Sequence, residues 1–130
     1  KVVREGSDLT VVTYGMMVHE TQKAAEQLAA NGIDVEIIDL RTLLPLDEDA
    51  ILHSVRKTNR LLIVHEDTRT GGIAGEIAMR VNEKAFEWLD APILRVTAID
   101  TPVPYSPPME DYFLPQVADI VTACEYLTRY

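Results

Sequence analysis

Short β-branched runs alternate regularly with amphipathic segments along this chain, and that alternation is what most constrains its fold. Runs rich in Val, Ile and Leu predict four strands, over 9–14, 33–40, 60–65 and 93–99. Apolar residues spaced three or four positions apart predict a helix after each run, over 18–31, 48–57, 73–89 and from 114 onward. Strands that alternate with helices favour a parallel sheet with helices on both faces. The sequence therefore predicts a three-layer α/β domain with a mostly parallel sheet.

Turn and cap signals predict where these elements begin and end. Lys1–Arg4 precede a turn, and we expect them to add a short antiparallel strand at the edge of the sheet. Asn31-Gly32 is a helix stop, Asp47 is a helix N-cap, and Pro115 is expected near the first turn of the last helix. The segment 101–108 holds four of the seven prolines and is expected to be irregular.

Helical periodicity predicts which side chains face the sheet. The helix over 73–89 is expected to be the longest, with a buried stripe of Ile73, Ile77, Val81, Ala85 and Leu89. The first helix is expected to bury one face made of Val18, Gln22, Ala25, Leu28 and Ala29. The last helix is expected to bury Val117, Ile120, Val121, Cys124 and Leu127.

Length and charge restrict the class of protein. We expect one domain, 1–130, and we expect it to be a fragment of a longer protein because it begins at Lys1 without an initiator Met. The net charge of −9 argues against nucleic acid as a partner and is compatible with a basic protein partner, although solubility alone also accounts for it. No apolar run reaches the roughly 18 residues that span a bilayer, so no membrane association is expected. The lone Cys124 fits a reducing compartment, a bacterial cytoplasm or a mitochondrial matrix.

Residues with catalytic or metal-binding chemistry form no specific motif. His19, His53 and His65 lie on separate elements without ligand spacing, so no metal site is expected. His65-Glu66-Asp67 stands where the third strand ends, where ligands of open α/β sheets gather, and is a candidate interface or loop site. Gly71-Gly72 opens the next helix and is a candidate anion-binding site. The alternative is a tight turn, in which case Gly75 is expected to allow close packing of the helix on the sheet. The residues alone leave the function open.

Several segments, taken in order, resemble one family. Residues 6–19 are similar to the start of the transketolase C-terminal domain, and residues 32–47 are similar to its second strand and the exit from it. The later motifs follow in the same order: Leu62-Ile-Val-His-Glu66, Thr70-Gly-Gly72, Gly75-Glu-Ile77, Leu89-Asp-Ala-Pro92, Arg95-Val96 and Asp100-Thr-Pro-Val-Pro104. The resemblance covers essentially the whole chain and is nearest to the beta subunit of the decarboxylase component of 2-oxoacid dehydrogenase complexes.

The resemblance implies an enzyme that uses thiamine diphosphate and magnesium to decarboxylate a 2-oxoacid and to acylate a lipoyl group. In that family the alpha part holds the diphosphate and magnesium through a GDG…N motif, and the aminopyrimidine ring lies against the N-terminal domain of the beta part. This sequence contains no GDG. We therefore expect no catalytic, cofactor-binding or metal-binding residue in this chain, and no turnover by the isolated domain.

The resemblance also implies protein partners. The family's domain accompanies an alpha subunit or a fused alpha domain, packs against its own copy across a two-fold axis, and helps to bind the peripheral subunit-binding domain of the acyltransferase. Matched by position, Asp90 and the terminal carboxylate of Tyr130 are the residues expected to meet basic side chains of that domain. Asp90 as a plain loop residue at a helix end is the alternative, and Tyr130 contributes only where the native chain ends there.

Substrate class follows from resemblance alone. His65-Glu66, Thr70-Gly71-Gly72 and Phe113-Leu114-Pro115 look more like enzymes for branched-chain 2-oxoacids such as 2-oxoisovalerate, whereas Val103-Pro104-Tyr105 also occurs in the pyruvate type. We expect a branched-chain 2-oxoacid, with pyruvate next. Two other classes stay open. One is a transketolase or deoxyxylulose-phosphate synthase, for which Arg69 is the lone basic candidate, and the other is a free-standing anion-binding regulatory module.

Overall fold

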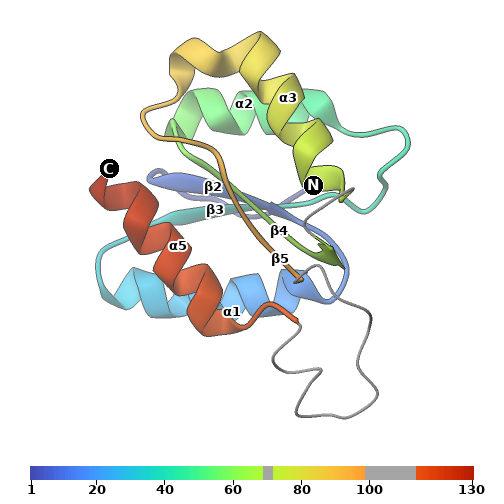
Figure 1. Ribbon diagram of the computed structural model, residues 1–130. Helices are drawn as coiled ribbons and strands as arrows, with labels where there is room; N and C mark the ends of the chain where they lie inside the picture. Colours follow the sequence, from blue (N-terminus) through green and yellow to red (C-terminus); the bar gives the residue numbers. More distant parts are fainter. Residues whose placement is uncertain (69–71, 99–113) are drawn as a thin grey trace, which may run out of the picture.

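Strands and helices alternate along the chain in the order that the sequence predicts (Figure 1). A computed structural model describes residues 1–68, 72–98 and 114–130. The strands are β1 (Val2–Arg4), β2 (Leu9–Thr13), β3 (Val35–Asp39), β4 (Leu61–Thr68) and β5 (Leu94–Ala98). The helices are α1 (Met17–Ala30), α2 (Glu48–Thr58), α3 (Ile73–Ala85) and α5 (Val117–Arg129), and a 3₁₀ turn, η1 (Phe86–Trp88), follows α3. No helix of these ranges is long and apolar enough to cross a membrane.

The strands form one five-stranded sheet in the order β1-β3-β2-β4-β5. β2, β3, β4 and β5 are parallel, and Val11 of the central β2 lies opposite Ile37 on one side and Leu62 on the other. β1 runs antiparallel to β3, with Val2 opposite Ile38. The predicted mostly parallel sheet is confirmed, and so is the short antiparallel edge strand at the N-terminus.

Helices cover both faces of this sheet, which makes the three predicted layers (Figure 1). α1 and α5 pack on one face, and α2 and α3 pack on the other. Along β4, Leu62 and Val64 face α1 and α5, while Leu61 and Ile63 face α2 and α3. A strand covered on both faces has no solvent side, which explains why this run is apolar throughout.

The predicted helix stop and N-cap are both confirmed. Gly32 adopts a φ of 81°, and its N–H and that of Ile33 donate to carbonyls in the last turn of α1. This Schellman arrangement favours glycine because an L side chain is strained at positive φ. At the start of α2, the Asp47 carboxylate accepts a hydrogen bond from the Ala50 N–H at 3.3 Å.

α3 is shorter than predicted. It ends at Ala85, whose φ of −142° leaves the helical region, so the 14-residue α1 is longer than the 13-residue α3. Leu89, expected to close the helix, is instead extended and still packs against the core below α3. Ile77, Val81 and Ala85 are each 1% exposed, so the centre of the predicted stripe is confirmed, whereas Ile73 and Leu89 are only partly buried.

The buried face of α1 differs from the prediction. Thr21 and Ala24 are buried, whereas Gln22 is partly exposed and Ala29 is exposed. Thr21 presents a methyl group as well as a hydroxyl, so a threonine serves here as an apolar position. The predicted face therefore included Gln22 and Ala29 in place of Thr21 and Ala24.

The start of α5 also differs from the prediction. Its N-cap is Gln116, whose N–H donates to the Asp119 carboxylate at 2.9 Å in a capping box, and the first helical residue is Val117. Pro115 therefore precedes the cap and does not lie in the first turn. The irregular segment predicted over 101–108 lies outside the described residues.

Candidate partner-binding site

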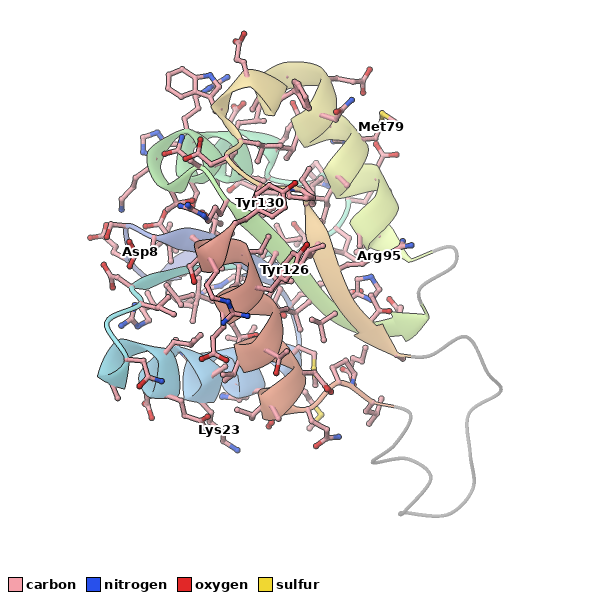
Figure 2. All side chains as sticks on the ribbon, turned by 60° about the vertical axis from the view of Figure 1, so that its left-hand side comes forward. Asp8, Lys23, Met79, Arg95, Tyr126 and Tyr130 are labelled. Atoms are coloured by element: carbon pink, nitrogen blue, oxygen red, sulfur yellow. The ribbon has the colours of Figure 1, made fainter. Side chains whose placement is uncertain are left out.

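Asp90 and Tyr130, which the sequence places on separate segments, line one hollow of about 320 Å³. The hollow lies at the amino ends of the parallel strands, because its floor includes Ile93, directly before β5. Its lining residues are Asn82, Phe86, Leu89, Asp90, Ala91, Pro92, Ile93 and Tyr130. Figure 2 shows Tyr126 and Tyr130 on the side of α5 that borders β5. The fold thus brings together the two residues that resemblance singled out.

Asn59 holds the segment that carries Asp90. It ends α2 in the left-handed region, with a φ of 65°, which asparagine tolerates better than most residues. Its side-chain amide donates to the Trp88 carbonyl, and its own carbonyl accepts from the Asp90 N–H, both at 2.8 Å. These two hydrogen bonds fix the backbone from Trp88 to Asp90, while the Asp90 side chain stays exposed.

Arg60 fixes the other wall of the hollow. Its Nε donates to the Leu127 carbonyl at 2.9 Å and so ties the last turn of α5 to the start of β4. Leu127 is fully buried, whereas Tyr126 and Tyr130 are 48% and 65% exposed, with ring centroids 6.1 Å apart. The end of α5 is thus anchored by Arg60 and by the buried Leu127, and it presents two aromatic rings to solvent.

The hollow combines an apolar wall with negative charge. Asp90 is the charged side chain among its lining residues, and a chain that ends at Tyr130 adds a second carboxylate. Phe86, 66% exposed, and Leu89 supply apolar surface next to Asp90. Lysine and arginine lay an apolar stem along such a wall while their charged heads pair with carboxylates. The arrangement can therefore bind a basic side chain from another protein.

His65, Glu66 and Asp67 lie together at the opposite, carboxyl end of the sheet. The Tyr14 hydroxyl donates to Asp67 Oδ2 at 2.7 Å, and the Tyr14 and His65 rings stack at 6.3 Å. His65 is fully buried, and its Nδ1 lies 3.1 Å from the carbonyl oxygen of Asp67. These contacts hold the last residues of β4 against the end of β2.

Burial decides the protonation of this second cluster. It lowers the pKa of His65, although the Asp67 carboxylate acts in the other direction. Burial also raises the pKa of Tyr14, and the hydrogen bond to Asp67 adds to that rise. Both rings are therefore neutral near pH 7, with the His65 Nδ1–H donating to the Asp67 carbonyl. These contacts stabilise the end of β4. Neither neutral ring offers a positive charge to an anion.

Of the glycines after β4, the structure describes Gly72 and Gly75. Gly72 precedes α3 in an extended conformation, with a φ of −75° and no side-chain cap, and Gly71 lies outside the described residues. A Cβ at Gly75 would meet no heavy atom within 4 Å, so the expected close packing of Gly75 on the sheet is wrong. Gly75 is exposed and lines a shallow hollow between α3 and β5.

Sequence reasoning missed the residues that build the candidate partner site around Asp90. Asn59 and Phe86 carried a signal, since asparagine after a helix often adopts positive φ and an exposed aromatic often marks an interface. Their meeting with Tyr130 depends on contacts between distant segments. Within residues 1–68, 72–98 and 114–130, no group of three His, Cys, Asp or Glu side chains could hold a metal ion.

The fold and this hollow define a class of α/β domain with a mostly parallel sheet and an antiparallel first strand. The family model described as "Transketolase, C-terminal domain" matches residues 1–120. The chain belongs to this family. A split-gene transketolase, solved as an inactive beta4 tetramer, superposes with a TM-score of 0.85 at 25% identity, over 99% of this chain and 41% of that one.

Curated relatives include beta subunits of three oxidoreductases. The pyruvate dehydrogenase E1 component subunit beta of Bacillus subtilis is 47% identical over 129 residues, 99% of this chain and 39% of that protein. The acetoin:2,6-dichlorophenolindophenol oxidoreductase subunit beta of Cupriavidus necator is 48% identical over 122 residues, 94% of this chain and 36% of that protein. The 2-oxoisovalerate dehydrogenase subunit beta of B. subtilis is 43% identical over 130 residues, 99% of this chain and 40% of that protein. The chain thus spans about two fifths of the length of these relatives.

Proposed function

We propose that this chain is the C-terminal assembly domain of the beta part of a thiamine-diphosphate-dependent 2-oxoacid dehydrogenase, within a longer polypeptide. Similarity to beta subunits of such oxidoreductases supports the assignment. The observation that carries the assembly role is the shared hollow of Asp90 and Tyr130. We further propose that the domain serves binding and that the chemistry belongs to the rest of the enzyme.

The partner of the hollow is a basic protein module, the peripheral subunit-binding domain of the acyltransferase. Asp90 is exposed beside apolar Phe86, so an incoming Lys or Arg finds a carboxylate next to a surface for its stem. The chain's net charge of −9 steers a basic partner toward it. Charge pairs at a rim govern association rate and salt dependence more than affinity. Binding should therefore weaken as salt rises.

The complete enzyme holds thiamine diphosphate and magnesium through an alpha subunit or a fused alpha domain, and it contains a second beta copy. These partners supply the cofactor ligands that the sequence of this domain lacks. Because Cys124 is a lone, buried cysteine, the domain needs no oxidising compartment, which agrees with a bacterial cytoplasm or a mitochondrial matrix.

The substrate is a 2-oxoacid, and branched-chain 2-oxoacids are the proposed type. His65-Glu66 and Phe113-Leu114-Pro115 favour that type by resemblance. Identities of 43% to 48% to 2-oxoisovalerate, pyruvate and acetoin enzymes do not separate the three substrates. Turnover of 2-oxoisovalerate and pyruvate by the complete enzyme, with an artificial electron acceptor, tests the choice. Faster turnover of pyruvate would contradict the branched-chain proposal.

The isolated domain provides a direct test of its assembly role. Incubated with 2-oxoacid, thiamine diphosphate, magnesium and an artificial electron acceptor, it should give no turnover. Turnover by the purified 130-residue chain would contradict the proposal, because turnover requires catalytic groups within the domain itself. Similarity to a split-gene transketolase favours one alternative, a phosphosugar transferase. Transfer between phosphosugars by the complete enzyme, without oxidation of 2-oxoacids, would establish that alternative.

A further inference from the structure

We propose that the carboxyl end of the sheet is the surface on which the preceding part of the polypeptide packs. The inference rests on the proposed function only in placing this domain within a longer chain. The carboxyl-end face, as we call this surface, consists of Val2, Met16, Leu43, Leu44 and Leu46.

Large apolar side chains are exposed on the carboxyl-end face. Leu44 is 93% exposed, Met16 is 71% exposed and Val2 is 41% exposed. These residues belong to β1 and to the connections that follow β3 and β2, and these three strands are neighbours in the sheet. Met16 and Leu44 therefore follow the carboxyl ends of β2 and β3, and Val2 lies opposite Ile38 near the carboxyl end of β3. Several large apolar side chains exposed at one end of an acidic chain's sheet mark a contact surface.

Leu44 is exposed because its own turn holds it there. Leu43 and Leu46 form an antiparallel bridge around it, and the Thr42 hydroxyl donates to the Pro45 carbonyl at 3.2 Å. Leu43 and Leu46 pack partly against the core below α2 and α3, which anchors both sides of the turn. The turn is thus fixed from within and presents a leucine to a surface outside this domain.

The start of the chain lies at this same face. The Lys1 amine donates to the Asp39 carbonyl at 2.9 Å, and the Asp39 N–H donates to the Lys1 carbonyl at 2.8 Å. Asp39 is the last residue of β3, so residues joined to Lys1 would emerge at the carboxyl end of the sheet. Figure 1 shows the N-terminus on the side of the connections that follow β2 and β3.

The length of the relatives argues that the occupant is the preceding chain. Relatives match this domain over only 36% to 40% of their own length, and the matching family model is of a C-terminal domain. A preceding domain tethered at Lys1 is held beside the carboxyl-end face at an effective concentration on the order of millimolar. Apolar residues of that domain can then bury Leu44 and Met16 without the entropic cost of a separate association.

The neighbouring hollow predicts one more property of the occupant. A hollow of about 220 Å³ next to the face is lined by Met16, Met17, Leu114 and Pro115 together with Glu20 and Glu66. Methionine and two carboxylates favour an apolar segment that also carries a basic residue. We therefore expect the preceding chain to place a Lys or Arg beside Glu20 and Glu66.

Hydrogen exchange, measured by mass spectrometry, tests this inference. The 130-residue chain is compared with the complete polypeptide encoded by the same gene. Peptides covering 14–20 and 41–47 should exchange at least tenfold more slowly in the complete polypeptide. A peptide covering 26–32, at the far end of α1, should exchange equally in both and serves as the internal control.

Variants separate docking from folding. Met16→Asp combined with Leu44→Asp should leave the Tm of the 130-residue chain unchanged, because both side chains are exposed. In the complete polypeptide the same variant should lose the added protection and should be cut by protease near Lys1. Ala29→Asp, at an exposed position on α1, should change neither result.

Three results would overturn the inference. Equal exchange of 14–20 and 41–47 in both chains would show that nothing covers the face. Protection that grows with the concentration of the 130-residue chain would identify a second copy as the occupant. A gene whose coding sequence begins at residue 1 would leave no preceding chain to dock. Loss of partner binding at Asp90, which tests the proposed function, would affect none of these measurements.

Discussion

Replacing Glu36 with Gln should lower the stability of the domain and flatten its dependence on pH. Glu36 lies in β3 and is 2% exposed. Its Oε1 accepts hydrogen bonds from Lys57 Nζ at 2.6 Å and from the Gly6 N–H at 3.1 Å, and its Oε2 accepts from the Ser54 hydroxyl at 2.6 Å. The Ser54 hydroxyl also lies 2.6 Å from that of Thr10, so the carboxylate ends a buried chain of hydroxyl groups.

The expected loss follows from the bonds that Glu36→Gln weakens. The amide keeps the shape of the carboxylate but removes its charge, and its NH₂ group conflicts with the Ser54 hydroxyl as donor. A hydrogen bond to a charged group contributes about 1.5–3 kcal/mol, and leaving a buried donor unpaired costs a similar amount. The Lys57 side chain is 40% exposed and can regain water, which limits the loss. We expect Glu36→Gln to lower the free energy of unfolding at pH 7 by about 1.5–3 kcal/mol.

The pH dependence has a definite sign. Burial alone raises the pKa of Glu36, but the bonds from Lys57, Ser54 and Gly6 outweigh burial and hold the pKa below its usual value of 4.5. A carboxyl with a lowered folded pKa contributes stability that is complete above its unfolded pKa and is lost as pH falls through its folded pKa. The difference in free energy of unfolding between wild type and Glu36→Gln should therefore shrink as pH falls below the usual glutamate pKa of 4.5.

Urea denaturation followed by circular dichroism measures both quantities. Wild type and variant are compared at pH 7 and at a series of lower pH values, with Glu26→Gln, on the exposed side of α1, as the matched control. The control should follow wild type throughout. Equal stabilities at pH 7, or a difference that stays constant down to about pH 3, would refute the assignment of Glu36 as a stabilising buried carboxylate.

Four further predictions concern packing and thiol chemistry. Ile77→Ala should lower the free energy of unfolding by about 2–5 kcal/mol because Ile77 is 1% exposed, whereas Met79→Ala, at a 56% exposed position, should change the denaturation midpoint little. Gly6→Ala should prevent folding, measured by circular dichroism, because its Cβ would lie 2.6 Å from the backbone nitrogen of Glu36. Gly75→Ala, in open space within α3, should instead raise stability by about 0.5–1 kcal/mol. The Cys124 thiol, fully buried with a pKa raised by burial to about 12, should react with a thiol reagent only after denaturant is added, and fast reaction of the native domain would contradict its burial.

The layers of this fold could be predicted because they depend on local patterns. The apolar run of β4 identified a strand buried on both faces. Asn31-Gly32 marked the end of α1 through the backbone preference of glycine, and Asp47 marked the start of α2 through its side-chain cap. The end of α3 could not be predicted, because Ala85 leaves the helix where the chain must return toward Asn59. That return depends on hydrogen bonds between segments far apart in the sequence.

Two residues of the candidate site could be identified from the sequence, but their arrangement in space could not. Resemblance identified Asp90 and Tyr130 one by one, but their shared hollow depends on Asn59 holding Asp90 and on Arg60 holding the end of α5. His65 was identified by its position at a strand end, but its burial, which lowers its pKa, depends on tertiary packing that includes the Tyr14 ring. Short local sequence patterns predict caps and turns. A surface hollow forms between segments far apart in the sequence, so predicting it requires knowledge of their tertiary contacts.

The most direct test of the assembly role is sedimentation of the 130-residue chain with a purified basic peripheral subunit-binding domain. The account predicts a complex at low salt that weakens as salt rises and that is weaker still with Asp90→Asn. Asp8→Asn, which removes a carboxylate near the start of β2, serves as the matched control and should bind as wild type does. No complex with well-folded wild-type domain, or a complex that Asp90→Asn leaves unchanged, would contradict the claim that the hollow of Asp90 and Tyr130 is the partner-binding site.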